Sequence, residues 1–193
     1  MKEDNIKRIL DLGIKGISQK GYHHLGLKQL LDTAGIPKGS FYYYFDSKED
    51  FAQKVVLRYS RNIVEHLKLF LLDKSKSPTE RFLTLFDERL NAYAECAYKE
   101  GCLMGDLSNE LAGQINSMQI LLEKEFSAWE EVISQCITEG QKLGEFNQNL
   151  TADELANFIL NSWEGALTRM KASRSKEPFE LFVKYTMNLV LKR

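Results

Sequence analysis

The sequence predicts an all-α fold: an N-terminal three-helix head and a larger helical domain, with about nine helices in all. Apolar residues recur at helical spacing along most of the 193 residues, and no segment alternates in the manner of β-strands. Only three prolines occur, and charged residues make up 27% of the chain. This composition favours helices over disorder. Glycines and capping signals divide the pattern into separate helices.

The first predicted helix spans residues 3–20. Gly21, directly after Lys20, suits the C′ position that ends a helix. The apolar positions of this helix lie three or four residues apart and are Ile6, Ile9, Leu10, Gly13, Ile14 and Ile17. A short loop then leads to the second helix.

Two short helices are predicted next, at 27–34 and 37–45. Gly35 ends the first, and Pro37 suits the start of the second because its missing N–H would have no partner there. The apolar face of the first comprises Leu27, Leu30, Leu31 and Ala34. The buried side of the second comprises Phe41, Tyr44 and Phe45. Helices this short are not stable alone, so they must pack on their neighbours.

A long fourth helix is predicted at 48–72, with Ser47 as its N-cap and Asp50 completing a partial capping box. Residues 74–78 form a linker. Thr151 and Glu154 give a second capping-box signature. Further helices are predicted at 79–99, 105–112, 114–143, 151–171 and 177–192.

Charge is distributed unevenly along the chain. Residues 1–60 contain ten Lys or Arg and seven Asp or Glu, whereas the remainder contains 16 basic and 20 acidic residues. A basic head on an acidic body is expected if only the head meets phosphate.

The helices at 27–34 and 37–45, joined through Gly35, have the pattern of a helix-turn-helix, whose second helix enters the DNA major groove. The outer face of this second helix carries groups that can contact phosphates and base edges, and it allows its backbone to approach DNA closely. These groups belong to Lys38, Gly39, Ser40, Tyr42 and Tyr43. Lys28 and Lys48 flank this face as phosphate clamps. The alternative is that residues 42–44 are only aromatic core, which is favoured for Tyr44 but would overfill a small head if Tyr42 and Tyr43 were included.

Residues 6–52 resemble the DNA-binding domain of TetR-family repressors. The resemblance rests on the run from Gly35 to Phe45 and on Ser47, Lys48 and Glu49. Two positions depart from the family pattern: Tyr44, where histidine is most frequent, and Leu27, near the usual place of a phosphate-binding threonine. Pattern and resemblance together predict the DNA-binding residues Lys28, Pro37, Lys38, Gly39, Ser40, Tyr42, Tyr43, Tyr44 and Lys48.

The same resemblance implies a helix-turn-helix domain at 1–50, with the helix 48–72 as connector, and a helical regulatory and dimerisation domain at 51–193. In this family the second domain dimerises through its last two helices and binds a small inducer. The implied dimer interface comprises Phe158, Ile159, Trp163, Ala166, Leu167, Phe179, Phe182, Val183 and Met187. The alternative is that these apolar stripes face the core of their own protomer.

Residues 101–111 are similar to a subgroup of the family that includes the repressors of N-ethylmaleimide reductase and of acrylate utilisation. The resemblance implies that Cys102, near a predicted helix N-terminus, senses electrophiles or oxidants. The alternative is a small buried apolar side chain, the commonest role of an unpaired cysteine. The predicted pocket or sensor residues are Cys102, Met104, Tyr93, Phe126, Trp129 and Trp163. The alternative for each of them is an ordinary side chain of the hydrophobic core.

No nucleophile elbow, metalloprotease motif or phosphate-binding loop is present, so an enzyme is not expected. Neither a cofactor nor a metal is expected, and the absence of a signal sequence or a long apolar run favours a cytoplasmic protein without membrane contact. The expected partners are double-stranded operator DNA, a second copy of the chain, and a small-molecule or reactive inducer. The alternatives are a helical adaptor bundle without DNA binding and a regulator that acts as an activator.

Overall fold

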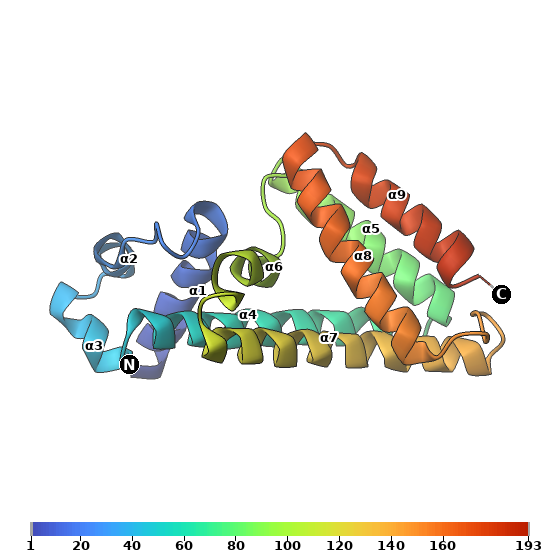
Figure 1. Cartoon of the computed structure of the whole chain (residues 1–193), viewed down its shortest axis with the longest axis horizontal. Helices are drawn as coiled ribbons and strands as arrows, with labels where there is room; N and C mark the ends of the chain where they lie inside the picture. Colours follow the sequence, from blue (N-terminus) through green and yellow to red (C-terminus); the bar gives the residue numbers. More distant parts are fainter. Residues whose placement is uncertain (1, 193) are drawn as a thin grey trace. The chain divides into compact units, whose positions relative to one another are not determined.

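A computed structural model describes residues 2–192, apart from the side chain of Lys38, and the regular secondary structure of the described residues consists of helices joined by loops, with no strand. This confirms the predicted all-α fold with nine α-helices in the described part of the chain (Figure 1). The helices are α1 (Lys2–Lys20), α2 (Leu27–Ala34), α3 (Phe41–Tyr44), α4 (Lys48–Leu71), α5 (Pro78–Glu95), α6 (Leu103–Leu107), α7 (Asn116–Lys142), α8 (Ala152–Ser173) and α9 (Glu177–Tyr185).

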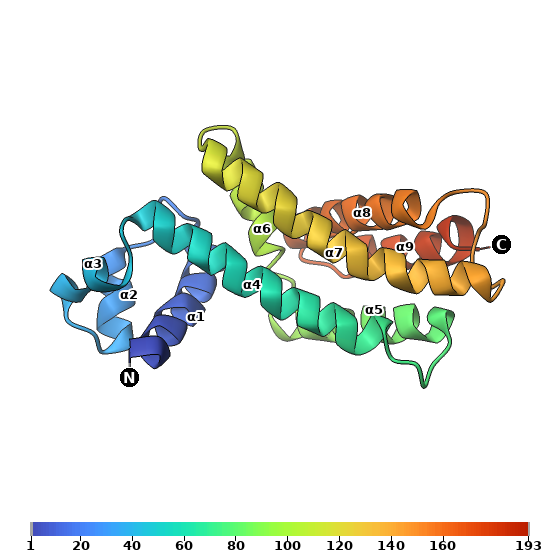
Figure 2. The ribbon, with the colours of Figure 1, turned by 90° about the horizontal axis from the view of Figure 1, so that it is seen from below.

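The helices form two compact units. The first, here called the head unit, contains the chain up to Asn62 together with Cys102–Glu125. The second, here called the body unit, contains Ile63–Gly101 and the chain from Phe126 onward. In the head unit α6 packs on α1, and in the body unit α8 and α9 lie side by side (Figures 1 and 2). The long helices α4 and α7 contribute residues to both units.

Side-chain caps fix the starts of three helices. Thr151 and Glu154 form the predicted capping box of α8, in which Glu154 N–H donates to the Thr151 hydroxyl at 3.2 Å. At α4 the Ser47 hydroxyl accepts from Asp50 N–H at 2.9 Å, while the Asp50 carboxylate accepts from the N–H of Asp46. Ser77 opens α5 with a full capping box, so the end of the predicted linker is already part of a helix start.

Four predicted helices differ from the structure. The helix expected at 37–45 divides into a 3-10 turn, Lys38–Ser40, and the short helix α3. The helix expected at 79–99 ends at Glu95, because Ala97 and Tyr98 adopt left-handed backbone angles with φ of 52° and 57°. The helix expected at 105–112 divides into α6 and a π-helical segment, Ser108–Ala112. The last predicted helix divides into α9 and a second π-helical segment, Thr186–Val190. Apolar spacing does not separate π-helical from α-helical backbone, since both bury one face of a coil.

Among the described residues, no helix combines the length and apolar character that a bilayer crossing requires.

Candidate nucleic-acid interface

The turn between α2 and α3 is built around Gly35. This residue has φ 65° and ψ 32°, a left-handed conformation that costs little only for glycine. Its N–H donates to carbonyls at the end of α2, and the N–H of Ile36 donates to the Leu31 carbonyl at 3.0 Å. These bonds satisfy the last carbonyls of α2 and reverse the chain. Pro37 then leads into a 3-10 turn, Lys38–Ser40, that runs directly into α3.

Buried aromatic rings hold α3 in place. Phe41 is 2% exposed and Phe45 is 1% exposed, and both rings contact Phe51 of α4 with centroid distances of 5.8 and 5.0 Å. Leu30, Leu31 and Ala34 bury the inner face of α2. Because α3 is only four residues long, this burial rather than helix propensity fixes its position.

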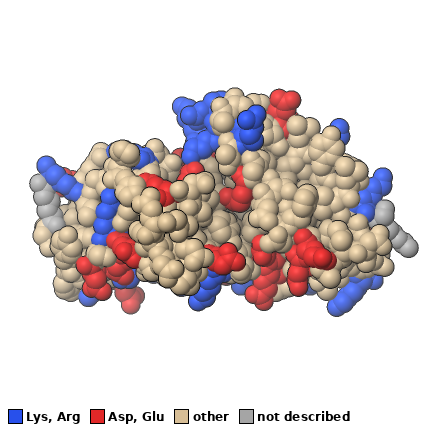
Figure 3. All heavy atoms as spheres, in the orientation of Figure 1, with Lys and Arg blue, Asp and Glu red and all other residues tan. Residues whose placement is uncertain are grey.

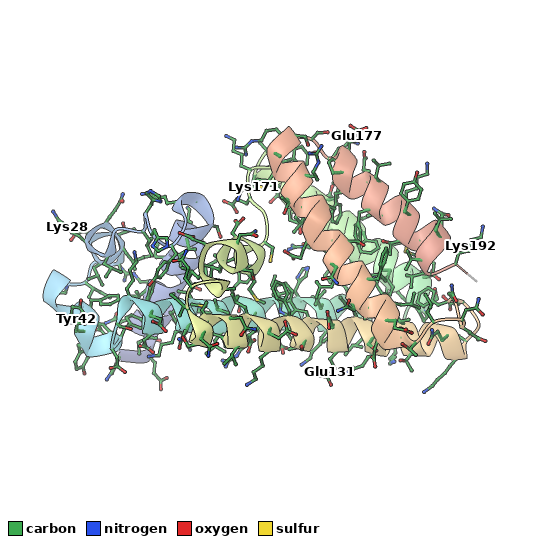
Figure 4. All side chains as sticks on the ribbon, viewed as in Figure 1. Lys28, Tyr42, Glu131, Lys171, Glu177 and Lys192 are labelled. Atoms are coloured by element: carbon green, nitrogen blue, oxygen red, sulfur yellow. The ribbon has the colours of Figure 1, made fainter. Side chains whose placement is uncertain are left out.

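The opposite face of α3 is open to solvent. Tyr42 is 73% exposed and Tyr43 is 64% exposed, although tyrosine is a residue of intermediate burial in folded proteins. A Cβ added to Gly39 would have no atom within 4 Å, so the backbone there is accessible to a large partner. Figure 4 labels Lys28 and Tyr42 where they leave α2 and α3. The exposed predicted contacts are Lys28, Pro37, Gly39, Tyr42 and Tyr43, and Ser40 is half-buried.

Tyr44 occupies a different environment from its two neighbours. Its side chain is half-buried, and its hydroxyl accepts a hydrogen bond from the Asn5 side chain of α1 at 3.1 Å. This contact attaches α3 to α1. The ring of Tyr43, in contrast, has the Lys2 ammonium 4.4 Å from its centroid. The side chain of Lys38, a predicted DNA contact, lies outside the described residues.

Lys48 begins α4 and contacts the loop between α1 and α2. Its Nζ donates to the His23 carbonyl at 3.3 Å and lies 4.6 Å from the centroid of the Tyr22 ring. An ammonium group has three N–H donors, so donors are left for a phosphate oxygen. On the face drawn in Figure 3, basic and acidic side chains both occur over the head unit. The candidate interface is therefore defined by specific side chains and not by a uniform positive surface.

The predicted pocket residues are divided between the two units. Cys102 and Met104 are buried in the head unit, where the Cys102 thiol accepts from the N–H of Gly105 at 3.5 Å. The other four predicted residues belong to the body unit. Trp129 stacks edge-on against Phe126 with a centroid distance of 5.4 Å, and the Trp163 indole N–H donates to the Tyr93 hydroxyl at 3.3 Å.

The predicted dimer residues occupy both the interior and the surface of the body unit. Trp163, Phe179 and Phe182 pack on one another with centroid distances of 5.4 to 5.6 Å. The buried members of the predicted set are Ile159, Trp163, Ala166, Leu167, Phe179 and Phe182. Phe158 is exposed, and Val183 and Met187 are half-buried.

Sequence reasoning missed most of an apolar groove between α8 and α9, although Phe158, Ala166 and Phe182 of its lining belong to the predicted dimer set. It has a volume of about 700 Å³ and is lined in part by Phe158, Leu181, Tyr185 and Leu189, all four of which are exposed. The signal was present, because residues 181, 185 and 189 follow one another at four-residue spacing on one helical face. The apolar stripe that was predicted as a dimer interface follows the neighbouring face of the same helix, which points inward.

Two short helices joined by a left-handed glycine, with exposed tyrosines on the second helix, define a helix-turn-helix DNA-binding protein. The chain belongs to the tetR family of bacterial regulatory proteins. The model of the family's DNA-binding part matches residues 9–55, and the model described as the tetracyclin repressor-like C-terminal domain matches residues 78–186. The chain is therefore a DNA-binding transcriptional regulator.

Relatives of known class cover nearly the whole chain. It is 31% identical to the HTH-type transcriptional repressor DhaR of Mycobacterium sp. (strain GP1), over 96% of this chain and 91% of that protein. It is 29% identical to the repressor NemR of Escherichia coli K12, over 98% and 95% of the two chains.

Two solved structures resemble the fold closely. The reduced form of E. coli NemR has a TM-score of 0.87 at 28% identity and covers 97% of this chain and 98% of that one. Regulatory protein TetR from Rhodobacter sphaeroides also has a TM-score of 0.87 at 28% identity, with coverages of 94% and 96%.

Proposed function

We propose that the chain is a homodimeric transcriptional repressor that binds a double-stranded DNA operator through the helix-turn-helix and is released by an inducer. The observation that carries the proposal is the contrast among residues 41–45, which form α3 and its C-cap. Phe41 and Phe45 are buried, whereas Tyr42 and Tyr43 project into solvent at the position that a recognition helix presents to the major groove. DhaR and NemR are named as repressors, which supports repression over activation.

The exposed face supplies two kinds of contact. Tyrosine offers a hydroxyl for phosphate oxygens and a ring for the methyl group of thymine, and the open backbone at Gly39 permits close approach. Lys28 on α2 and Lys48 at the start of α4 then act as phosphate clamps on either side. Phosphate contacts set the register, and α3 reads the bases.

The groove on α8 and α9 supports the homodimer. It exposes Phe158, Leu181, Tyr185 and Leu189 in one apolar patch, and such patches on soluble proteins mark interaction sites. A two-fold interface between copies of this patch would form a four-helix contact and give two DNA-binding heads. Two heads match an operator with two half-sites.

Release of DNA is proposed to follow binding of a small molecule or modification of Cys102 by an electrophile or oxidant. Cys102 is the N-cap of α6, it is 6% exposed, and its sulfur accepts a hydrogen bond from the N–H of Gly105. Cys136 is fully buried, and burial raises the pKa of its thiol to about 12, which disfavours the thiolate that reacts with electrophiles. The resemblance to NemR, solved in a reduced form, supports redox or electrophile control.

A mobility-shift titration with the DNA upstream of the gene for this protein tests DNA binding. The wild-type protein is expected to shift this fragment, and Lys38→Ala and Tyr42→Ala are each expected to weaken binding by about tenfold. Leu150→Ala, at an exposed apolar side chain of the body unit, is the control and is expected to bind as wild type. Absent binding, or binding unaffected by both head substitutions, would overturn the proposal.

Treatment with a mild electrophile such as N-ethylmaleimide tests the role of Cys102. Release of DNA is expected from wild type and from the Cys96→Ser control, but not from Cys102→Ser. If Cys102→Ser releases DNA as wild type does, the cysteine arm of the proposal is wrong and a non-covalent inducer is the remaining route.

A further inference from the structure

Glu110 makes hydrogen bonds that the proposed role of the DNA-binding face does not explain. It lies in the π-helical segment Ser108–Ala112, which follows α6 within the head unit. Its Oε2 accepts from the N–H of Tyr22 at 2.9 Å, and its Oε1 accepts from the N–H of His23 at 2.9 Å. One carboxylate is thus bound by two successive amides of the loop between α1 and α2.

Lys48 contacts the same loop through different groups. The Lys48 ammonium contacts the His23 carbonyl and the Tyr22 ring, while Glu110 contacts the amides of these two residues. Gly21 makes the arrangement possible, because it has a φ of +78° and a Cβ there would lie 3.3 Å from Oε2 of Glu110. The Tyr22–His23 turn is therefore contacted by both an anion and a cation, which come from two different elements.

The location of the carboxylate indicates a role other than helix capping. It lies just beyond the C-terminal end of α1, where the helix dipole disfavours a negative charge. The two charge-assisted hydrogen bonds offset this cost. π-helical turns are rare and occur frequently at functional positions, and the π-helical segment here contains Glu110.

A second contact joins the same parts of the head unit. Glu49, next to Lys48, accepts a hydrogen bond from the Ser117 hydroxyl of α7 at 2.6 Å. Gln53 also donates to Ser117 at 3.1 Å. The first turn of α4, which carries Lys48, is therefore attached to the segment 102–125 both directly and through the Tyr22–His23 turn.

We propose that Glu110 is a positioning residue for DNA binding, because it fixes the Tyr22–His23 turn that holds the Lys48 ammonium in place for a DNA phosphate. The inference rests on the proposed function and extends it to a residue 62 positions away from Lys48 in the sequence. One donor of the ammonium is used by His23, and the others stay available to phosphate. A lysine held in this way loses less side-chain freedom when it binds DNA.

Hydrogen exchange on the unbound full-length protein tests the anchor itself. In Glu110→Ala and Glu110→Gln the amides of Tyr22 and His23 are expected to exchange at least about tenfold faster than in wild type, because each loses a charged acceptor. The amides of Leu30 and Leu31 in α2 are expected to keep their protection, which shows that the head is folded. Glu123→Gln, an exposed substitution on α7, is the matched control and is expected to leave all four amides unchanged.

DNA titration tests the link to Lys48. Lys48→Ala in the wild-type background is expected to lower affinity for the upstream DNA by about tenfold and to reduce the slope of log K against log salt by about 0.9, the value of one phosphate contact. Glu110→Ala is expected to lower affinity by about five- to tenfold, since it frees the loop that holds Lys48. Adding Lys48→Ala to Glu110→Ala is expected to cost less than about threefold more, because the two residues act through one contact.

The outcomes separate this inference from the proposed function. If wild type does not bind the DNA specifically, the proposed function is overturned and the positioning role with it. If wild type binds but Glu110→Ala binds equally well, or the effects of the two substitutions multiply, only the positioning role is overturned. Unchanged exchange of the Tyr22 and His23 amides in both Glu110 variants would contradict the anchor directly.

Discussion

A single left-handed residue, Gly35, sets the turn between α2 and α3. Its φ of 65° is unfavourable for any residue with a Cβ, and the Arg8 guanidinium would lie 3.1 Å from that added atom. Gly39, four residues later, has open space at the same place. These two glycines serve different purposes: the first is required by the backbone, and the second leaves a surface open.

Gly35→Ala is expected to lower the free energy of unfolding by about 1–2 kcal/mol, because alanine in a left-handed conformation is strained. Gly39→Ala is the matched control and is expected to change stability by less than about 0.5 kcal/mol while weakening DNA binding. Urea unfolding followed by circular dichroism, together with a DNA titration, measures both quantities. Equal stability losses in the two variants would show that Gly35 is not the constrained residue.

Among the elements, α4, α5 and α7 are connected at one point by an ion pair. Arg81 of α5 is buried, and its guanidinium donates to both carboxylate oxygens of Glu139 on α7, at 2.8 and 3.2 Å. Its Nε also donates to the Lys76 carbonyl in the turn after α4. The hydrogen bond from Arg81, with a further bond from Lys74, lowers the pKa of Glu139 from 4.5 to about 2.

This pair gives a stability contribution that depends on pH. Because the pKa of Glu139 is lower in the folded state, its contribution is complete above about pH 5 and is lost as pH falls from about 4 toward 2. Glu139→Gln is expected to be about 1–3 kcal/mol less stable than wild type at pH 7, since it leaves a buried guanidinium without its anion. The difference between the two proteins is expected to narrow between pH 5 and pH 3.

Urea unfolding at pH 7, 5 and 3 measures this difference, with Glu131→Gln on the exposed side of α7 as the control (Figure 4). The control is expected to match wild type at every pH. A gap between Glu139→Gln and wild type that stays constant with pH would mean that the carboxylate charge of Glu139 is not the source of its effect.

The elements were predictable from sequence where periodicity and capping residues agreed. The spacing of Leu30, Leu31 and Ala34 predicted α2, and the capping-box pair Thr151 and Glu154 predicted the start of α8. The π-helical segments were not predictable, because their apolar residues keep a helical spacing. The contact of Glu110 was not predictable either, since its partner Tyr22 lies 88 residues away. Apolar periodicity predicts which face of a helix is buried. It does not predict which residue from a distant part of the sequence contacts that helix.

The exposed fractions of the side chains distinguish residues that the sequence pattern alone could not distinguish. Tyr42, Tyr43 and Tyr44 are consecutive tyrosines, yet two are exposed and Tyr44 is half-buried against Asn5. Successive side chains of an α-helix point about 100° apart around its axis, so the consecutive tyrosines of α3 lie on different faces. The same ambiguity affected α9, where the apolar residues of the surface groove are neighbours of those in the core.

For the whole molecule, the proposed dimer makes a prediction about assembly. Leu189→Glu places a charge on the exposed part of the groove, so it is expected to convert a dimer into a monomer without unfolding the protomer. Sedimentation equilibrium measures the mass, and circular dichroism checks the fold. Leu143→Glu, at another exposed leucine of the body unit, is the control and is expected to stay dimeric. A Leu189→Glu protein that is still a dimer would place the interface elsewhere.

The central claim is that the helix-turn-helix reads a specific DNA sequence. Fluorescence anisotropy with the upstream DNA and with a shuffled fragment of equal length, at several salt concentrations, tests it most directly. We expect wild type to bind the upstream fragment at least about 10³-fold more tightly than the shuffled one, with affinity falling steeply as salt rises. We also expect Tyr42→Ala to reduce this ratio while leaving the weak binding to shuffled DNA unchanged. Equal affinity for both fragments, or a ratio that Tyr42→Ala does not alter, would contradict the account.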